Sequence, residues 1–354
     1  MLQKPLSPTK FEAQRCSESR RFLVLARVGD KSLHKSWLTD APVSRTWDLQ
    51  LNAYGKNESL FRDGDLPTVF DNGTKWDSIA RHFRAHPDLF DRYDYIMLPD
   101  DDLLMKAADI NRLFEIAVEH DLTMAQPALT LESYLSYPIL LRMPGFRLRY
   151  STFLEAMACC IKSSYLRSLL PLFERHSSWG TDLVWGLLME NPAFRAAIVD
   201  EVPMTHTRPL YTGPLYDTLA ERRVDPRDEV RVFTASFENL PPGMQIYGGY
   251  LANGRRVGPF EVRIRNAIGL LNIAGRSKLR FNSYRMGFAL LMRAFTRLRY
   301  RPEQLRAVAG SAMAELGLGA PSLSSVFGMA PSETTPSGRW HPSSEMDGGN
   351  SIAT

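Results

Sequence analysis

Three consecutive carboxylates, Asp100, Asp101 and Asp102, stand directly after Pro99 and the apolar run Tyr95–Leu98. The run has the length and composition of a strand covered on both faces, and the proline ends its pairing. In an extended backbone, the first and third carboxylates would project to the same side and could bind one cation. Mg²⁺ and Mn²⁺ favour such oxygen ligands. The alternative is an acidic turn that stabilises the start of the following helix.

Other charged residues stand where strands should end or helices should begin. Arg27 and Asp30 end the first apolar run and could contact a nucleotide, with a surface ion pair as the alternative for each. Lys75 opens a helix that carries Trp76 and Phe83 at core spacing. A cation is unfavourable at a helix N-terminus unless an anion such as phosphate lies nearby, so the sequence offers either an anion site or a solvated lysine.

A further aspartate, a histidine and an arginine complete the set of candidates. Asp182 stands in or near the first turn of a helix, where it could be a general base or could simply offset the helix dipole. His206 and Arg208 follow the strand expected at 197–202, which places an imidazole and a guanidinium just past a strand end. An ordinary hydrogen-bonded surface histidine is the alternative for His206.

Strands and helices are expected to alternate along the first two thirds of the chain, which indicates an α/β fold with a mostly parallel sheet flanked by helices. Ligands of such sheets bind at the carboxyl ends of the strands. The segment 131–150 lacks a clear period and is rich in aromatic residues, prolines and arginines, so it is expected to be a long functional loop. The strand expected at 153–161 carries Glu155 and two adjacent cysteines, for which inert packing is expected.

Composition bounds the class of protein. The chain has 354 residues, is 44% hydrophobic and carries a net charge of +4, so it can bury a large core. Its 3 cysteines form neither a disulfide framework nor a metal spacing, which favours a reducing, cytoplasmic compartment. Residues 1–20 resemble no signal peptide, and no apolar run is long enough to span a bilayer. The sequence contains no P-loop, G-x-S-x-G elbow or H-E-x-x-H helix.

The composition changes after residue 240. Residues 255–301 contain twelve Arg or Lys residues and one acid, Glu261, on segments of helical pattern. Such a basic amphipathic segment can lie on the anionic inner face of a membrane, where each cation contributes about 1 kcal/mol. The alternative is an ordinary helix that packs on the catalytic domain. Nucleic acid is not an expected partner, because no recognised binding fold accompanies the charge.

The predicted organisation has four parts: a flexible arm (1–19), a catalytic domain (20–240), a basic helical extension (241–318) and a disordered tail (319–354) rich in Ser, Pro, Gly and Thr.

Short motifs follow one another in a defined order: Arg27-Val28-Gly29-Asp30, Gly73-Thr74-Lys75-Trp76, Tyr93-Asp94-Tyr95, Asp100-Asp101-Asp102-Leu103, Gln126-Pro127-Ala128-Leu129 and Trp179-Gly180-Thr181-Asp182. In this order they resemble a domain-of-unknown-function family of plants and bacteria. Its members are regarded as nucleotide-sugar glycosyltransferases with a GT-A-like core. Pro99 is a departure, since plant relatives often have tryptophan there.

The resemblance implies a role for several residues. Asp100 and Asp102 would hold Mn²⁺ or Mg²⁺ against the donor diphosphate, with His206 as a third ligand. Asp182 would be the base. The charge of the leaving group adds a further role: the departing nucleoside diphosphate gains negative charge, so the cation, with Lys75 or Arg208 where they reach it, would stabilise the transition state.

The function that these roles predict is the transfer of a sugar from a nucleotide-sugar donor to a glycan or lipid-linked acceptor, with either inversion or retention at the anomeric carbon. Two alternatives remain. One is a catalytically inactive nucleotide- or glycan-binding protein on the same fold, and the other is a metal-dependent phosphohydrolase, which would normally need more carboxylates.

Overall fold

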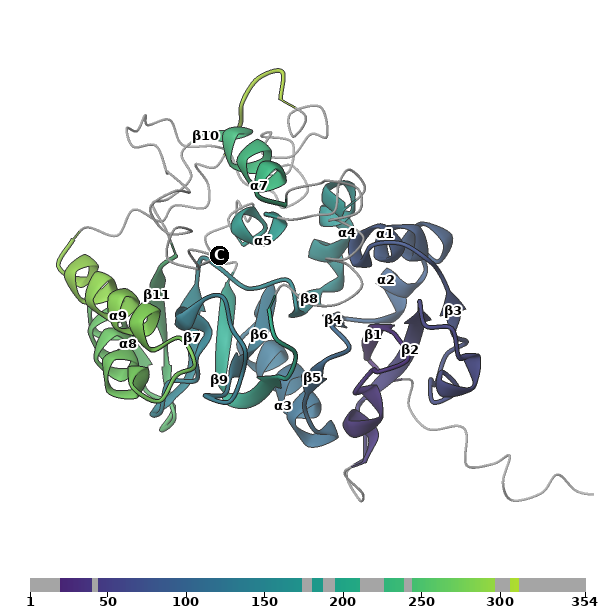
Figure 1. Ribbon diagram of the computed structural model, residues 1–354, viewed down its shortest axis with the longest axis horizontal. Coiled ribbons are helices and arrows are strands. Elements are labelled where there is room, and N and C mark those ends of the chain that lie inside the picture. The colour runs from purple at the N-terminus through teal and green to yellow at the C-terminus, as the bar shows by residue number, and fades with distance from the viewer. Residues whose placement is uncertain are drawn as a thin grey trace, which may run out of the picture.

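The computed structural model describes residues 20–39, 44–173, 180–186, 195–210, 226–238, 244–296 and 306–311 (Figure 1). An eleven-stranded sheet lies at the centre, in the order β12-β11-β7-β9-β6-β8-β4-β1-β2-β3, with β5 paired to β9. Its strands are β1 (Phe22–Val28), β2 (Trp47–Ala53), β3 (Val69–Phe70), β4 (Tyr95–Pro99), β5 (Leu103–Leu104), β6 (Met124–Leu129), β7 (Phe146–Ser151), β8 (Ala158–Lys162), β9 (Ala196–His206), β11 (Ile246–Leu251) and β12 (Arg256–Val257). A second, two-stranded sheet pairs β10 (Phe237–Glu238) with β13 (Arg306–Ala307).

Helices flank the main sheet. They are α1 (Lys75–Ala85), α2 (Leu89–Arg92), α3 (Ala107–Glu119), α4 (Ser163–Phe173), α5 (Thr181–Val184), α7 (Pro226–Ala235), α8 (Pro259–Ala274) and α9 (Arg280–Ala294), with three short 3-10 turns, η1 (His34–Leu38), η2 (Glu58–Leu60) and η3 (Pro138–Leu140). The α/β class is therefore confirmed. No helix among the described residues is long and apolar enough to cross a membrane.

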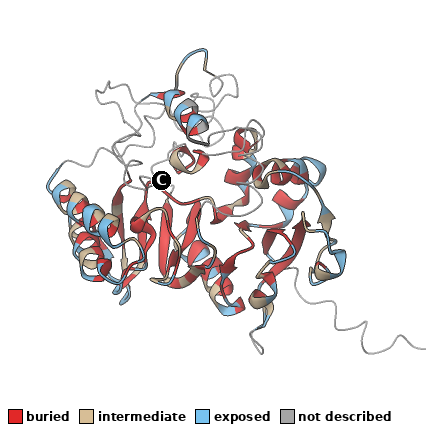
Figure 2. Cartoon of the chain, in the orientation of Figure 1, coloured by how far each residue is buried: buried red, intermediate tan, exposed pale blue. Residues whose placement is uncertain are grey.

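The parallel half of the sheet comprises the first four strands. β1 pairs in parallel with β2 and with β4, and β2 pairs in parallel with β3. Every residue of β1, β2 and β4 is buried, and the central strands are almost uniformly buried in Figure 2. Continuous burial is what strands covered on both faces require, and it explains the apolar runs of β1 and β4. In β2, apolar residues alternate with Asp48, Gln50 and Asn52, and these polar residues are buried as well. The carboxyl ends of β1, β2 and β4 therefore meet at one edge.

The other half of the sheet is mixed, so the expectation of a mostly parallel sheet is wrong there. β8 runs antiparallel to both β4 and β6, and β7 runs antiparallel to both β9 and β11. Among the described strands of this half, only β6 and β9 pair in parallel. β9 also runs further than the expected 197–202, so that His206 is its last residue and not a loop residue.

The predicted loop 131–150 contains one of the sheet strands, β7, and that prediction is wrong for its second part. The arginines of this segment suggested a loop, but one of them lies in the core. Arg149 is fully buried and donates to both carboxylate oxygens of Asp200, at 2.8 and 2.9 Å. It also donates to the backbone carbonyls of Ile139 and Leu141, at 3.0 and 2.8 Å. A buried arginine is tolerated where every donor is satisfied in this way.

The chain after residue 240 continues the main sheet before it forms helices. β11 pairs with β7, and β12 forms the edge beyond it. α8 packs against β11, and α9 packs against α8. Two helices therefore occur where the basic helical extension is expected. The predicted arm 1–19 and the predicted tail 319–354 lie outside the described residues.

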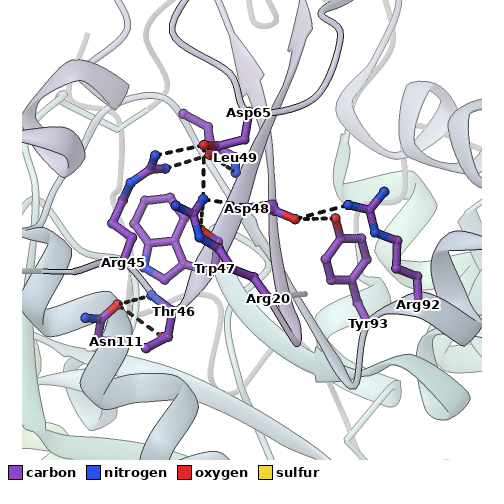
Figure 3. Close-up of polar contacts among 10 residues, drawn as sticks. All are labelled: Arg20, Arg45, Thr46, Trp47, Asp48, Leu49, Asp65, Arg92, Tyr93 and Asn111. Atoms are coloured by element: carbon purple, nitrogen blue, oxygen red, sulfur yellow. Dashed lines mark hydrogen bonds and ion pairs between the residues drawn. The ribbon is translucent and has the colours of Figure 1, made fainter. Parts of the chain in front are cut away.

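A network of charges holds the amino end of β2, at the edge opposite the acidic turn (Figure 3). Asp48 accepts hydrogen bonds from the Tyr93 hydroxyl at 2.7 Å and from Arg20 at 3.1 Å. Asp65 accepts from Arg20 at 3.0 Å, from Arg45 at 2.8 and 3.0 Å, and from the Leu49 backbone N–H at 2.9 Å. These residues come from separate segments, so the network links the segments at the amino end of β2 and stabilises the folded protein.

Replacing Asp65 by Asn is expected to destabilise the protein by about 1–2 kcal/mol at neutral pH, because a carboxylate with four donors loses its charge-assisted hydrogen bonds. Burial alone would raise the pKa of Asp65, but the bonds from Arg45, Leu49 and Arg20 lower it below its ordinary value of 3.8. The contribution is therefore present above pH 3.8 and is lost as the pH falls through the folded-state pKa.

Denaturant unfolding at neutral and acidic pH measures this effect. Asp94→Asn is the matched control, because Asp94 forms one exposed ion pair with Arg21 and should cost less than about 0.5 kcal/mol. Equal losses for the two variants, or an Asp65 effect that persists at low pH, would contradict the prediction.

Candidate functional site

The acidic turn connects β4 to β5, and β5 pairs with the end of β9, where Leu103 lies opposite His206. This pairing brings together two segments that are about a hundred residues apart in the chain. Asp101 and Asp102 lie in a turn and not in an extended segment, so the simple alternation expected from the sequence does not apply. Each of the three carboxylates meets a different set of partners.

Asp100 forms an ion pair with Lys75, the first residue of α1. The Lys75 Nζ donates to Asp100 Oδ1 at 2.6 Å and to the carbonyl oxygen of Ala156 at 2.9 Å. The Asp100 side chain remains 40% exposed, whereas that of Lys75 is 15% exposed. The anion that offsets a lysine at this helix start is therefore a protein carboxylate, and the exposed face of that carboxylate can reach solvent or a ligand.

Asp101 is buried and ties two loops to the turn, a role that the sequence analysis did not assign to it. Its Oδ2 accepts from the Gly29 backbone N–H at 2.8 Å and from the Tyr54 hydroxyl at 2.9 Å. A side chain at Gly29 would place its Cβ 2.7 Å from the Tyr54 ring, so only glycine permits this approach. Burial and the charge of Asp101 raise the pKa of Tyr54, which keeps its hydroxyl a donor.

Asp102 faces His206 across 3.3 Å, from Oδ2 to Nε2. The His206 Nδ1 lies 2.7 Å from the carbonyl oxygen of Tyr134 and must donate to it, which leaves Nε2 directed at the carboxylate. Arg208 approaches Asp102 at 3.5 Å and Asp101 at 3.4 Å. Among the described residues, Asp102 Oδ1 is buried and lacks a hydrogen-bond partner.

The pKa values of this pair respond to each other. Burial alone would raise the pKa of Asp102, but the hydrogen bond and charge of His206, together with Arg208, lower it below its ordinary value. Burial alone would lower the pKa of His206, but Asp102 raises it above its ordinary value. A carboxylate that faces an imidazole nitrogen in this way needs a proton or a cation between the two groups.

Arg27 lies near the end of β1, and Asp30 lies in the turn that follows, next to Gly29. Arg27 is buried and donates to the side chain of Asn52, to the Asp71 carbonyl at 2.6 Å and to the Gly73 carbonyl at 2.8 Å. Its guanidinium lies 5.0 Å from the centroid of the Tyr54 ring. Asp30 accepts from the backbone N–H of Asn57 at 3.1 Å. Both residues therefore brace loops at the carboxyl ends of the strands.

Asp182 lies at the start of α5. The helix follows Gly180, whose φ of +93° belongs to the left-handed region that favours glycine. The Asp182 carboxylate accepts backbone hydrogen bonds at its own position, at Leu183 and at Ala156, yet burial outweighs them and raises its pKa to about 7. The tryptophan of its motif, at position 179, lies outside the described residues.

Glu155 is a member of the site that sequence reasoning missed. It lies in the loop 152–157, because β8 begins at Ala158 and not at the expected residue 153. Burial first, and the charge of Asp182 second, raise the pKa of Glu155 to about 8. Its Oε2 is buried and has no hydrogen-bond partner among the described residues. The sequence does carry one indication of this role, because Glu155 is a lone acid inside an apolar stretch. A buried acid must be either neutral or paired with a positive group.

The loop 152–157 connects these groups. Ala156 accepts from Lys75 through its carbonyl and donates to Asp182 through its N–H. Asp100 also raises the pKa of Glu155, and His206 lowers it, so the charges of both residues act on this carboxyl group. The structure therefore gathers Lys75, Asp100, Glu155 and Asp182 around one loop, beside Asp102 and His206.

The described residues contain no preformed cluster of three or more His, Cys, Asp and Glu side chains that could hold a metal ion. The three ligands predicted from the sequence are divided, since Asp102 and His206 face each other and Asp100 faces Lys75. A cation here would therefore be held first by Asp102 and His206.

Comparison with known sequences adds a family match. No curated protein matches the chain significantly. Residues 65–202 match the model of a family described as a protein of unknown function, DUF707. The matched segment includes Lys75, the acidic turn, Glu155 and Asp182, and it ends shortly before His206 and Arg208. Over these residues, the chain is similar to a family whose function is unknown.

Proposed function

We propose that this protein is a metal-dependent glycosyltransferase with a GT-A-like fold, which moves a sugar from a nucleotide-sugar donor to a hydroxyl of a glycan or lipid-linked acceptor. One observation carries the proposal. The acidic turn at the carboxyl end of β4 and a second carboxyl group, Asp182, whose pKa is raised to about 7, are both bonded to the loop 152–157. Lys75 links Asp100 to the Ala156 carbonyl, and the Ala156 N–H donates to Asp182. The acidic turn suits a diphosphate with its cation, and Asp182 suits proton transfer at neutral pH.

The donor side of the site would be the edge where β1, β2 and β4 end. Open α/β sheets bind nucleotides outside the carboxyl ends of such strands. Lys75 and Arg208 bring two cations to this edge, and each is paired with a carboxylate of the acidic turn. Negative charge develops on the leaving diphosphate as the glycosidic bond breaks, so these cations would stabilise the transition state more than the ground state.

A partial site for Mn²⁺ or Mg²⁺ is available, although the described residues contain no preformed cluster of three ligands. Asp102 has one buried oxygen without a partner, and the His206 Nδ1–H is held by Tyr134, an arrangement that orients Nε2 as metal-ligating histidines require. Asp102 and His206 would hold the ion, and Asp100 would join them if it released Lys75. When bound, the ion would add positive charge for the diphosphate.

Asp182 and Glu155, the two carboxyl groups whose pKa values are raised, would act on the acceptor. Asp182 would take the proton from the acceptor hydroxyl as its oxygen bonds to the anomeric carbon, while the bond to the diphosphate breaks and the diphosphate leaves with the electron pair. Glu155, with a pKa near 8, would remain protonated at neutral pH and could donate a hydrogen bond. The charge of Asp182 raises the pKa of Glu155, so an ionised Asp182 would favour a protonated Glu155 beside it.

Thermal stabilisation of the full chain against nucleoside diphosphates and their sugars, with and without Mn²⁺, tests the proposal. A ligand that binds only the folded protein raises its melting temperature by mass action. We expect a Mn²⁺-dependent shift with one nucleotide, and sugar transfer once an acceptor is supplied. Binding without transfer to any glycan or lipid-linked acceptor would favour an inactive binding protein. No shift with any nucleotide would overturn the proposal.

A further inference from the structure

The outer helix of the C-terminal pair, α9, carries a continuous stripe of exposed apolar side chains. Phe281, Tyr284, Phe288, Met292 and Phe295 follow one another at intervals of three or four residues, so they lie on one face of the helix. Phe281 is 79% exposed, and both Met292 and Phe295 are 70% exposed. Isolated exposed apolar residues are ordinary, but a contiguous stripe of this size marks an interaction surface.

This stripe is distinct from the face that α9 buries. Ser283, Gly287, Leu290 and Ala294 are the buried residues of the helix, and a Cβ at Gly287 would lie 2.8 Å from the Leu271 side chain of α8. The close approach that glycine permits therefore fixes α9 on α8 with its apolar stripe turned outward. α8 and α9 lie at the β11 edge of the molecule, where exposed surface follows both helices (Figures 1 and 2).

The inner helix extends the same surface. Phe260 of α8 is 57% exposed. The Phe260 ring lies 5.9 Å from the Phe295 ring in an edge-on contact, which joins the start of α8 to the end of α9. We call these six side chains, four on α9, Phe295 at its C-terminal end and Phe260 on α8, the hairpin apolar face.

The charges beside this face have one sign. Arg276, Lys278, Arg280 and Arg285 are exposed, and residues 262–296 contain no acid. The single acid of the region, Glu261, is engaged by Arg255 and by Arg265, the latter at 2.7 Å. A second copy of the chain would bring arginines against arginines, whereas an anionic partner would be attracted.

We propose that the hairpin apolar face docks on the surface of a membrane that contains anionic lipid. Aromatic, aliphatic and Met side chains would enter the boundary between headgroups and acyl chains, and the flanking cations would meet lipid phosphates. The 15 residues of α9 are too few to cross a bilayer, so the helix would lie in the plane of the membrane. This inference stands independently of the proposed function, although a lipid-linked acceptor would lie on the same membrane.

Flotation of the full chain with vesicles tests the docking. We expect the protein to float with vesicles of phosphatidylcholine and phosphatidylglycerol, and to float less at high salt or with phosphatidylcholine alone. The double variant Phe288→Asp, Met292→Asp should reduce the bound fraction about tenfold or more, since two large apolar contacts are replaced by charges. Val118→Asp is the matched control, because Val118 is an exposed apolar residue of another helix, α3.

A second variant changes no apolar contact. Arg280→Glu with Arg285→Glu should abolish the preference for anionic vesicles while the melting temperature stays that of the wild type. Wild-type protein that fails to float with anionic vesicles, or variants that float as the wild type does, would overturn the proposal. A dimer of the wild type in sedimentation equilibrium would also overturn the proposal if the double variant Phe288→Asp, Met292→Asp were a monomer. The hairpin apolar face would then join two copies of the chain. Nucleotide-induced stabilisation of the same variants reports on the proposed function separately.

Discussion

Asp102→Ala is expected to abolish the Mn²⁺-dependent stabilisation by nucleotide, with binding weakened about 100-fold or more. Asp102 is the carboxylate that faces His206, and its Oδ1 is buried without a described hydrogen-bond partner, so Asp102 is the carboxylate best placed to hold a cation beside the imidazole. The loss should appear only with Mn²⁺ present, because the variant lacks a ligand of the metal ion but keeps the positive side chains of Lys75 and Arg208, which can still contact the diphosphate. Calorimetric titration of Mn²⁺ and nucleotide into the variant measures the effect.

The control for this variant is Asp94→Ala, just before the other end of the same strand. Asp94 pairs with Arg21 at an exposed position, and its removal should leave Mn²⁺ and nucleotide affinity unchanged. The melting temperature of each unliganded variant separates a general loss of stability from a loss of binding. Asp102→Ala protein that binds Mn²⁺ and nucleotide as tightly as the wild type would remove Asp102 from the site.

Asp182→Asn is expected to spare donor binding and to lower the transfer rate by about 10²–10⁴-fold, the usual contribution of a positioned base. The pH profile gives the sharper result. Since burial raises the pKa of Asp182 to about 7, the base is protonated and inactive below that pH, and the wild-type rate should rise as the pH increases through about 7. The variant should lose this rise, because an amide does not titrate.

Transfer rates between pH 5.5 and 9, about two units either side of neutrality, measured alongside donor affinity, distinguish a base from a structural residue. Asp91→Asn serves as control, because Asp91 forms an exposed ion pair with Arg167 on the surface and should retain the wild-type profile. Unchanged turnover in Asp182→Asn would exclude Asp182 as the base. Loss of donor binding would instead indicate that Asp182 holds the start of α5 and the loop 152–157 in place.

Local sequence patterns correctly predicted the helices and strands that do not depend on a contact with a residue far away in the chain. The apolar runs of β1 and β4 and the helix α1 lie where the sequence predicts them, because the local pattern of apolar residues follows the burial of each segment. The acidic turn was also predictable, since proline and three carboxylates end a buried strand in any context. Where prediction failed, the cause was a distant partner. β7 was taken for a loop because Arg149 is stabilised by Asp200, 51 positions away.

The chain by itself therefore determined the α/β class, the acidic turn at a strand end, and the residue types available for chemistry. Tertiary structure alone decided which partner each carboxylate has. Asp100 meets Lys75, Asp101 meets Gly29 and Tyr54, and Asp102 meets His206, because three consecutive residues in a turn point in different directions. It also decided that Asp182 and Glu155 titrate near neutrality. Burial beside other charges shifts a pKa, and burial depends on segments that the local sequence does not contain.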